Sequence, residues 1–199
     1  MSKTILCVIE IDENKIKKSS LEFMTAAMKI KDYENCKEIC AVVLNETPQN
    51  FKNELFSYGF DKVYGLPSSL FNHYRTQAYS AALQKLISKL NPDFVLIPST
   101  CNGRDLGPYL AVLANASIIA DVTDITKEGN DTIYIRPIYV GNLISYNKFT
   151  KADGVKILPI RSKAFLLPEA TNSLEGEYIE EKVELGEENV GNKVLEVVK

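Results

Sequence analysis

The chain has 199 residues, a length that predicts one domain with at most a short appendage. Its 45% hydrophobic and 25% charged residues are ordinary for a globular protein with a core of its own. The formal net charge of -3 gives no reason to expect nucleic acid or an anionic membrane surface as a partner. The first residues lead straight into an apolar strand without a signal-peptide pattern, and no apolar run reaches the roughly 20 residues that span a bilayer. We therefore expect a cytoplasmic protein.

Apolar strands and amphipathic helices alternate through the first 122 residues. We expect strands at residues 4–9, 39–44, 62–66, 94–97 and 118–122. We expect one helix after a capping box at Ser19-x-x-Glu22, and further helices at residues 51–58, 75–90 and 105–115. The short connections predict right-handed crossovers and a parallel sheet covered by helices on both faces.

The pattern changes after residue 130. Residues 132–149 and 155–160 have the character of strands, with no helix between them. Pro137 indicates an edge or bulged position, and Gly141-Asn142 predicts a turn between antiparallel strands. The predicted fold class is therefore α/β, a three-layer, Rossmann-like architecture whose mostly parallel sheet carries an antiparallel extension.

The composition shifts again after Pro168. Residues 169–199 are rich in Glu, Gly and Asn, with two weak extended runs at 178–185 and 194–198. This segment has too few large apolar side chains to form a core. We expect a domain over residues 1–168, followed by an arm over 169–199 that lies on this domain or on a partner.

One polar turn is a candidate binding site. Asn102, Gly103, Arg104 and Asp105 follow the strand at 94–97 and open the next helix. Ligands of open α/β sheets bind at the carboxyl ends of strands, and a helix N-terminus attracts anions, so these residues are candidates for a phosphate or nucleotide. The alternative is a structural role, in which Gly103 forms the turn, Asp105 caps the helix, Pro108 fits its first turn and Arg104 pairs with a carboxylate.

Two further groups of polar residues follow. Asp121 and Asp124 stand three apart, which in an extended chain directs them to opposite faces, so we expect no metal site there. Arg136, Tyr139 and Asn142 are interface candidates, because Arg and Tyr are frequent where proteins dock. The alternative is a strand with a packed tyrosine and an arginine that reaches solvent.

Cysteine and histidine residues do not form a metal-binding or catalytic pattern. Cys36 and Cys40 lack the spacing of a zinc or redox motif, and His73 is the sole histidine. We expect reduced structural thiols, no metal site and no catalytic residues.

Three sequence blocks together resemble a known family. They are T-C-N-G-R-D-L-G-P at residues 100–108, A-D-V-T-D at 120–124 and R-P-I-Y-V-G-N at 136–142. Their order resembles the N-terminal domain of the alpha subunit of electron transfer flavoproteins, and the resemblance runs from the first strand to about residue 165. Asn115 stands where the family usually has glycine, and Tyr109 where a basic residue is common.

The resemblance implies a scaffold and subunit-docking domain with a fold of the adenine nucleotide alpha hydrolase type. The partner would be the beta subunit of a heterodimer. FAD would be held by a glycine-rich C-terminal domain that this chain lacks, with residues 194–199 resembling the linker to it, so we expect no cofactor on this chain alone. The flavin would receive electrons from dehydrogenases and pass them to a flavoprotein or quinone reductase. A free-standing nucleotide-binding module of the same fold is the alternative, and a homodimer of the isolated domain stays open.

Overall fold

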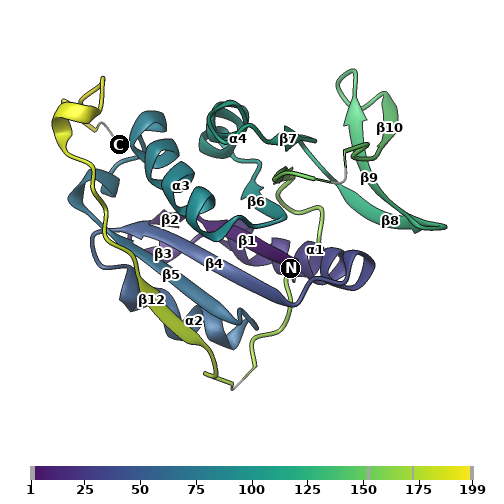
Figure 1. The fold of residues 1–199 in the computed structure, drawn as a ribbon, viewed down its shortest axis with the longest axis horizontal. Coiled ribbons are helices and arrows are strands. Elements are labelled where there is room, and N and C mark those ends of the chain that lie inside the picture. The colour runs from purple at the N-terminus through teal and green to yellow at the C-terminus, as the bar shows by residue number, and fades with distance from the viewer. Residues whose placement is uncertain (1–2, 152, 172, 198–199) are drawn as a thin grey trace.

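The computed structural model describes residues 3–151, 153–171 and 173–197. Within these residues, a seven-stranded sheet has the order β12-β5-β4-β1-β6-β11-β7, and each neighbouring pair is parallel (Figure 1). Its strands are β1 (Thr4–Ile9), β4 (Glu38–Asn45), β5 (Lys62–Pro67), β6 (Phe94–Pro98), β7 (Ser117–Ile118), β11 (Lys156–Ile160) and β12 (Glu177–Glu180). The long helices are α1 (Lys18–Glu34), α3 (Thr76–Leu90) and α4 (Cys101–Leu113), and α2 (Lys52–Ser57) is short.

Side chains of β1 alternate between two cores, one on each face of the sheet. Ile5 and Cys7 pack with apolar residues of α1 and α2, whereas Leu6 and Val8 pack with residues of α3 and α4. A strand that is buried on both faces must be apolar at every position, which explains the continuous apolar run at residues 4–9. The three-layer α/β class predicted from the sequence is confirmed.

The antiparallel strands form a sheet of their own. It has the order β10-β9-β8, with β8 (Asp124–Glu128), β9 (Asp131–Ile138) and β10 (Leu143–Asn147), and it lies to one side of the main sheet (Figure 1). The strand expected at 118–122 is reduced to β7 and a single bridge between Val122 and Ile160. Residues 124–128, which alternate weakly, were not expected to form a strand.

The strand expected at 155–160 is a member of the parallel sheet. As β11 it lies between β6 and β7, and all of its five residues are buried. The apolar run Ile157–Ile160 therefore has the same cause as that of β1, since both strands are covered on two faces. A further hairpin of β2 (Ile11–Asp12) and β3 (Lys15–Ile16) connects β1 to α1.

Two helix starts differ from the sequence-based expectation. The prediction of a capping box at Ser19 is wrong, because α1 begins at Lys18 and its N-cap, Lys17, makes no side-chain capping bond. Glu22 instead accepts a hydrogen bond from the backbone N–H of Lys163, at 2.6 Å. Helix α4 begins at Cys101, four residues early, because Thr100 caps it by accepting from the N–H of Gly103 at 3.1 Å.

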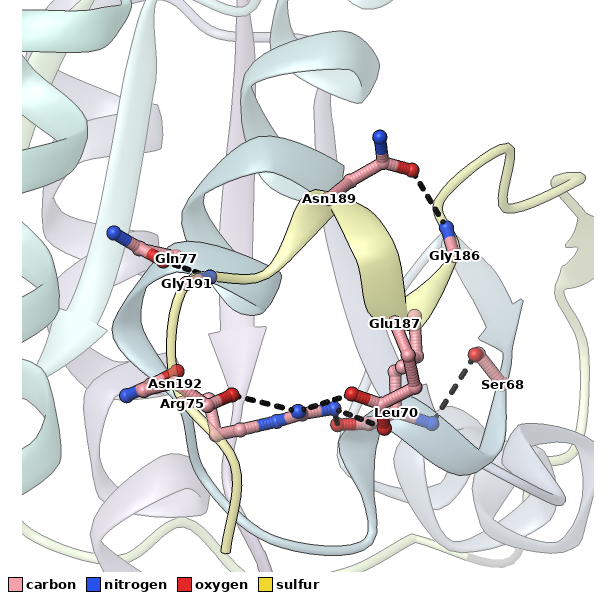
Figure 2. Close-up of polar contacts among 9 residues, drawn as sticks. All are labelled: Ser68, Leu70, Arg75, Gln77, Gly186, Glu187, Asn189, Gly191 and Asn192. Atoms are coloured by element: carbon pink, nitrogen blue, oxygen red, sulfur yellow. Dashed lines mark hydrogen bonds and ion pairs between the residues drawn. The ribbon is translucent and has the colours of Figure 1, made fainter.

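The arm packs on its own domain. Strand β12 extends the main sheet beside β5, and the short helix η3 (Glu187–Asn189) then lies against the start of α3. Figure 2 shows the contacts that hold it: Arg75 donates to both carboxylate oxygens of Glu187, at 2.7 and 3.0 Å, and Gly191 donates its N–H to Gln77 at 2.6 Å. The extended run expected at 194–198 has no strand in its described part, and Val198 lies outside the described residues. The division into a domain at 1–168 and an arm at 169–199 stays a prediction.

Among the described residues, no helix is long and apolar enough to cross a bilayer.

Candidate functional site

The order in which the chain adds strands to the sheet reverses between β1 and β6. From β1 the chain proceeds outward through β4 to β5, and from β6 it continues on the other side toward β7 and β11. In open α/β sheets the carboxyl ends of such a strand pair form the usual ligand crevice. A cavity of about 190 Å³ lies there, and the residues that line it include Glu10, Lys17, His73, Asn102 and Leu106.

Glu10 lies at the start of helix α4. Its Oε1 accepts a hydrogen bond from the Thr100 hydroxyl, at 2.5 Å, and Thr100 is the N-cap of the helix. The ammonium of Lys17 is 3.6 Å from Oε2. Burial raises the pKa of Glu10, and the hydrogen bond from Thr100 and the positive charge of Lys17 oppose that rise. Through the Thr100 hydroxyl, a carboxylate of the chain itself therefore lies beside the N-terminal, positive end of the helix.

The four residues of the predicted polar turn lie within the first helical turns, and their side chains separate. Asn102 lines the crevice, whereas Arg104 reaches toward Asp121, with 3.9 Å between Nη2 and Oδ1. Gly103 packs so tightly on the end of β6 that a Cβ would lie 1.7 Å from the Pro98 carbonyl oxygen. Asp105 accepts a hydrogen bond from Tyr74 Oη, at 2.9 Å.

The structural alternative for this turn is therefore correct in part. Arg104 does pair with a carboxylate, but Asp105 is no cap, since Thr100 has that role. Pro108 lies inside α4 and not in its first turn. Glu10, an anion, lies beside the helix start, and the binding of a phosphate or nucleotide at residues 102–105 stays a prediction.

Asp121 connects the segments that follow β6 and β11. Arg161 donates to both of its oxygens, one of them from Nε at 3.0 Å, and Ser99 donates its hydroxyl at 3.2 Å. The Arg161 hydrogen bonds hold the pKa of Asp121 below its usual value. Asp124 pairs separately with Lys29, at 2.7 Å, so the two carboxylates do not converge. Among the described residues, no three His, Cys, Asp or Glu side chains are grouped to hold a metal ion.

The interface candidates lie on the small sheet. Tyr139 and Val140 form the tip between β9 and β10, both at positive φ (50° and 57°), and Gly141 donates its N–H to the Ile138 carbonyl at 3.1 Å. The turn is thus centred two residues before the expected Gly141-Asn142. A left-handed conformation is rare for a β-branched residue such as Val140. Arg136 lies on β9, opposite Ser145 of β10, and its buried Nε has no hydrogen-bond partner in the part of the chain that the structure describes.

An exposed apolar patch surrounds this tip. We define it by its exposed large side chains, which are Tyr139, Val140, Leu143, Ile144 and Tyr146. Each of them is at least 53% exposed, and Val140 is completely so. Strand β10 is also an edge of its sheet, so its outer N–H and C=O groups are not paired by another described strand. Ile144 and Tyr146 lie on one face of β10 and Leu143 on the other, because successive side chains of a strand alternate. Exposed apolar side chains gathered at an unpaired strand edge mark sites where another protein docks.

Three features of the site were not found from the sequence. Glu10 and Thr100 belong to the crevice and Arg161 to the Asp121 cluster. Glu10 and Arg161 follow directly on the end of a strand, and Thr100 stands two residues after the end of β6. A polar residue at the carboxyl end of a buried strand was the available signal. The four cysteines are free, as the sequence predicts, and Cys101 is exposed whereas the other three are buried.

The fold and the crevice define a Rossmann-like α/β domain with a small antiparallel sheet at its side. The family model of the electron transfer flavoprotein domain matches residues 5–185, and the chain belongs to this family. It is similar to electron transfer flavoprotein subunit alpha of Bacillus subtilis, with 27% identity over 199 residues, 100% of this chain and 59% of that protein. The corresponding subunit of Clostridium acetobutylicum is 30% identical over 72% of this chain and 43% of its own length.

A third relative has a different name. It is the lactate dehydrogenase (NAD(+),ferredoxin) subunit LctC of Acetobacterium woodii, which is 30% identical over 74% of this chain and 35% of its own length. The chain spans about half the length of the alpha subunits that it matches. The resemblance to alpha subunits inferred from the three sequence blocks is confirmed.

Proposed function

We propose that the chain is the scaffold and subunit-docking domain of an electron transfer flavoprotein alpha subunit. The partner is the beta subunit of the family, and the assembled protein carries electrons on FAD from dehydrogenases to a flavoprotein or quinone reductase in the cytoplasm. Family membership supports this proposal, and so do relatives whose names include alpha subunits and a lactate dehydrogenase subunit.

One observation carries the docking role: the apolar patch on an edge strand of the small sheet. Leu143, Ile144 and Tyr146 are exposed on the same short strand, and exposed apolar edges are prone to pair with another chain. Interfaces are enriched in aromatic side chains at their centre, which fits Tyr139 and Tyr146.

The crevice does not fit FAD. A dinucleotide needs a glycine-rich turn that lets its pyrophosphate approach a helix N-terminus. Here the hydrogen-bonded side chains of Thr100 and Glu10 lie at the start of α4, and the sequence between β6 and α4 lacks a glycine-rich turn. We therefore propose that the chain itself holds no flavin and carries out no catalysis, and that FAD binds elsewhere in the complete protein.

The experiment is a titration of the purified chain with the beta subunit of its own source, followed by light scattering after size exclusion. A one-to-one complex is expected. The variant Tyr146→Ser should weaken the complex about tenfold or more, as for a buried aromatic residue at an interface. Tyr109→Ser, on the exposed side of α4, is the matched control and should bind as the parent does. Failure of the parent chain to form any complex would contradict the proposal.

A further inference from the structure

The crevice contains a carboxylate oxygen that the chain leaves without a hydrogen bond. Oε2 of Glu10 is buried and has no hydrogen-bond partner among the described residues, although Oε1 receives the Thr100 hydroxyl. The Glu10 side chain is 12% exposed. A buried oxygen of this kind costs free energy unless a donor reaches it.

The ammonium of Lys17 neutralises the negative charge of the Glu10 carboxylate only in part. Its ammonium is 3.6 Å from Oε2, too far for a hydrogen bond, and is 4.0 Å from Asp12 as well. The Lys17 side chain is 32% exposed, so water also reaches it. The charged groups that line the cavity are the two carboxylates of Glu10 and Asp12 and the ammonium of Lys17.

We propose that this crevice binds a small organic cation with N–H donors, an alkylguanidinium or alkylammonium compound, and that Glu10 Oε2 is its acceptor. The donors pair with the buried oxygen, and the alkyl part lies along the apolar wall formed by Val8, Ile97 and Leu106. Charge-assisted hydrogen bonds of this type are short and strong, and a guanidinium matches a carboxylate in shape. This site is independent of the docking role proposed above.

Two other ligand classes fit the crevice less well. A phosphate in the crevice would lie beside the Glu10 carboxylate, and two negative charges that are close together repel each other. A metal ion needs several convergent ligands, and the described residues contain no such group of His, Cys, Asp or Glu. The cavity of about 190 Å³ also exceeds what a bare ion requires.

The test is a titration of the isotope-labelled chain followed by nuclear magnetic resonance of its amide groups. The probes are N-butylguanidinium, its neutral isostere N-butylurea, and adenosine monophosphate. We expect saturable shifts at Glu10, Asn102 and Leu106 with N-butylguanidinium, and binding at least about tenfold weaker with N-butylurea, because a charged hydrogen bond is lost. Saturable shifts at these residues with adenosine monophosphate but not with N-butylguanidinium would overturn the proposal, and so would no saturable shift with any probe.

Two variants with opposite expected effects on the affinity for N-butylguanidinium extend the test. Glu10→Gln should weaken N-butylguanidinium binding about tenfold or more, whereas Lys17→Met should tighten it by removing the competing ammonium. Glu128→Gln, an exposed position on β8, is the control for the change of charge and should bind as the parent does. If Glu10→Gln does not fold, Lys17→Met and the neutral probe decide the question. Unchanged binding by Glu10→Gln, or weaker binding by Lys17→Met, contradicts the assignment of Glu10 as acceptor.

Discussion

Arg75 and Glu187 are 112 residues apart in the chain and form a two-bonded ion pair at the start of helix α3. The Arg75 side chain is only 6% exposed, and it also donates to the carbonyl oxygen of Asn192, at 3.1 Å. This pair, seen in Figure 2, fixes the end of the arm on the domain after β12 has joined the sheet. A buried guanidinium that loses its carboxylate partner is left uncompensated, so the contact depends on both residues.

We expect Glu187→Ala to release the arm. Without the carboxylate, Arg75 retains only carbonyl partners, and the segment at residues 181–192 should open more often. Limited proteolysis measures this as faster cleavage within that segment. Glu188→Ala is the matched control, since Glu188 is the exposed neighbour of Glu187 in the same short helix. Equal cleavage rates for the two variants would show that the ion pair does not hold the arm.

We expect the contribution of Asp121 to the stability of the fold to vary with pH. The Arg161 hydrogen bonds lower the pKa of this carboxyl group in the folded chain. A group with a lowered folded-state pKa stabilises the fold above its unfolded value of about 3.9 and loses that contribution as the pH falls through the folded value. Asp121→Asn should therefore lower the unfolding midpoint at neutral pH, and the difference should shrink below about pH 4.

Thermal unfolding of the two proteins from neutral pH to acid measures this difference. Asn tolerates the left-handed backbone of residue 121 (φ 64°), so the variant removes the charge without straining the chain. Asp153→Asn at an exposed position is the control. A midpoint difference that stays constant across the whole range would contradict the role of the ionised Asp121.

We expect Val95→Ala to destabilise the domain by about 1–3 kcal/mol, through lost burial and the cavity that remains. Val95 is fully buried in β6, an interior strand of the sheet between β1 and β11. Chemical denaturation measures the free energy of unfolding. The same substitution at Val112, which is 82% exposed on α4, is the control and should change it by less than about 0.5 kcal/mol. A change too small to resolve in Val95→Ala would contradict the central position of this strand.

We expect the purified chain to be colourless and to bind FAD weakly or not at all. The reason is the occupied helix start, where Thr100 and Glu10 bond to each other. Absorbance between 350 and 500 nm after incubation with excess FAD and removal of free flavin is the measurement. A yellow preparation with one flavin per chain would contradict the proposal that FAD binds elsewhere in the complete protein.

Local patterns in the sequence were enough to predict the main sheet. The apolar runs at residues 4–9, 39–44 and 94–97 correspond to β1, β4 and β6. A strand that is covered on both faces needs an apolar side chain at every position, so its sequence alone reveals it. The arm was harder to place. Its strand β12 contains Glu177 and Glu180 and depends on pairing with β5, a partner more than 100 residues earlier in the chain.

The candidate site was predicted less well, for a physical reason. A capping pattern such as Ser19-x-x-Glu22 is local, but Glu22 found a tertiary partner in Lys163. The interactions of Glu10 with Thr100 and of Asp121 with Arg161 likewise join the ends of different strands. Sequence spacing does not encode which strand ends become neighbours, whereas strand order does.

Hydrogen–deuterium exchange of the chain, alone and with the beta subunit, tests the docking claim most directly. The outer N–H groups of β10 have no strand partner among the described residues, so they should exchange fast in the free chain. The account predicts that the beta subunit slows exchange at residues 138–147, while the arm at 181–192 is unaffected. Protection of another face, with unchanged exchange at 138–147, would contradict the assignment of the apolar patch as the docking surface.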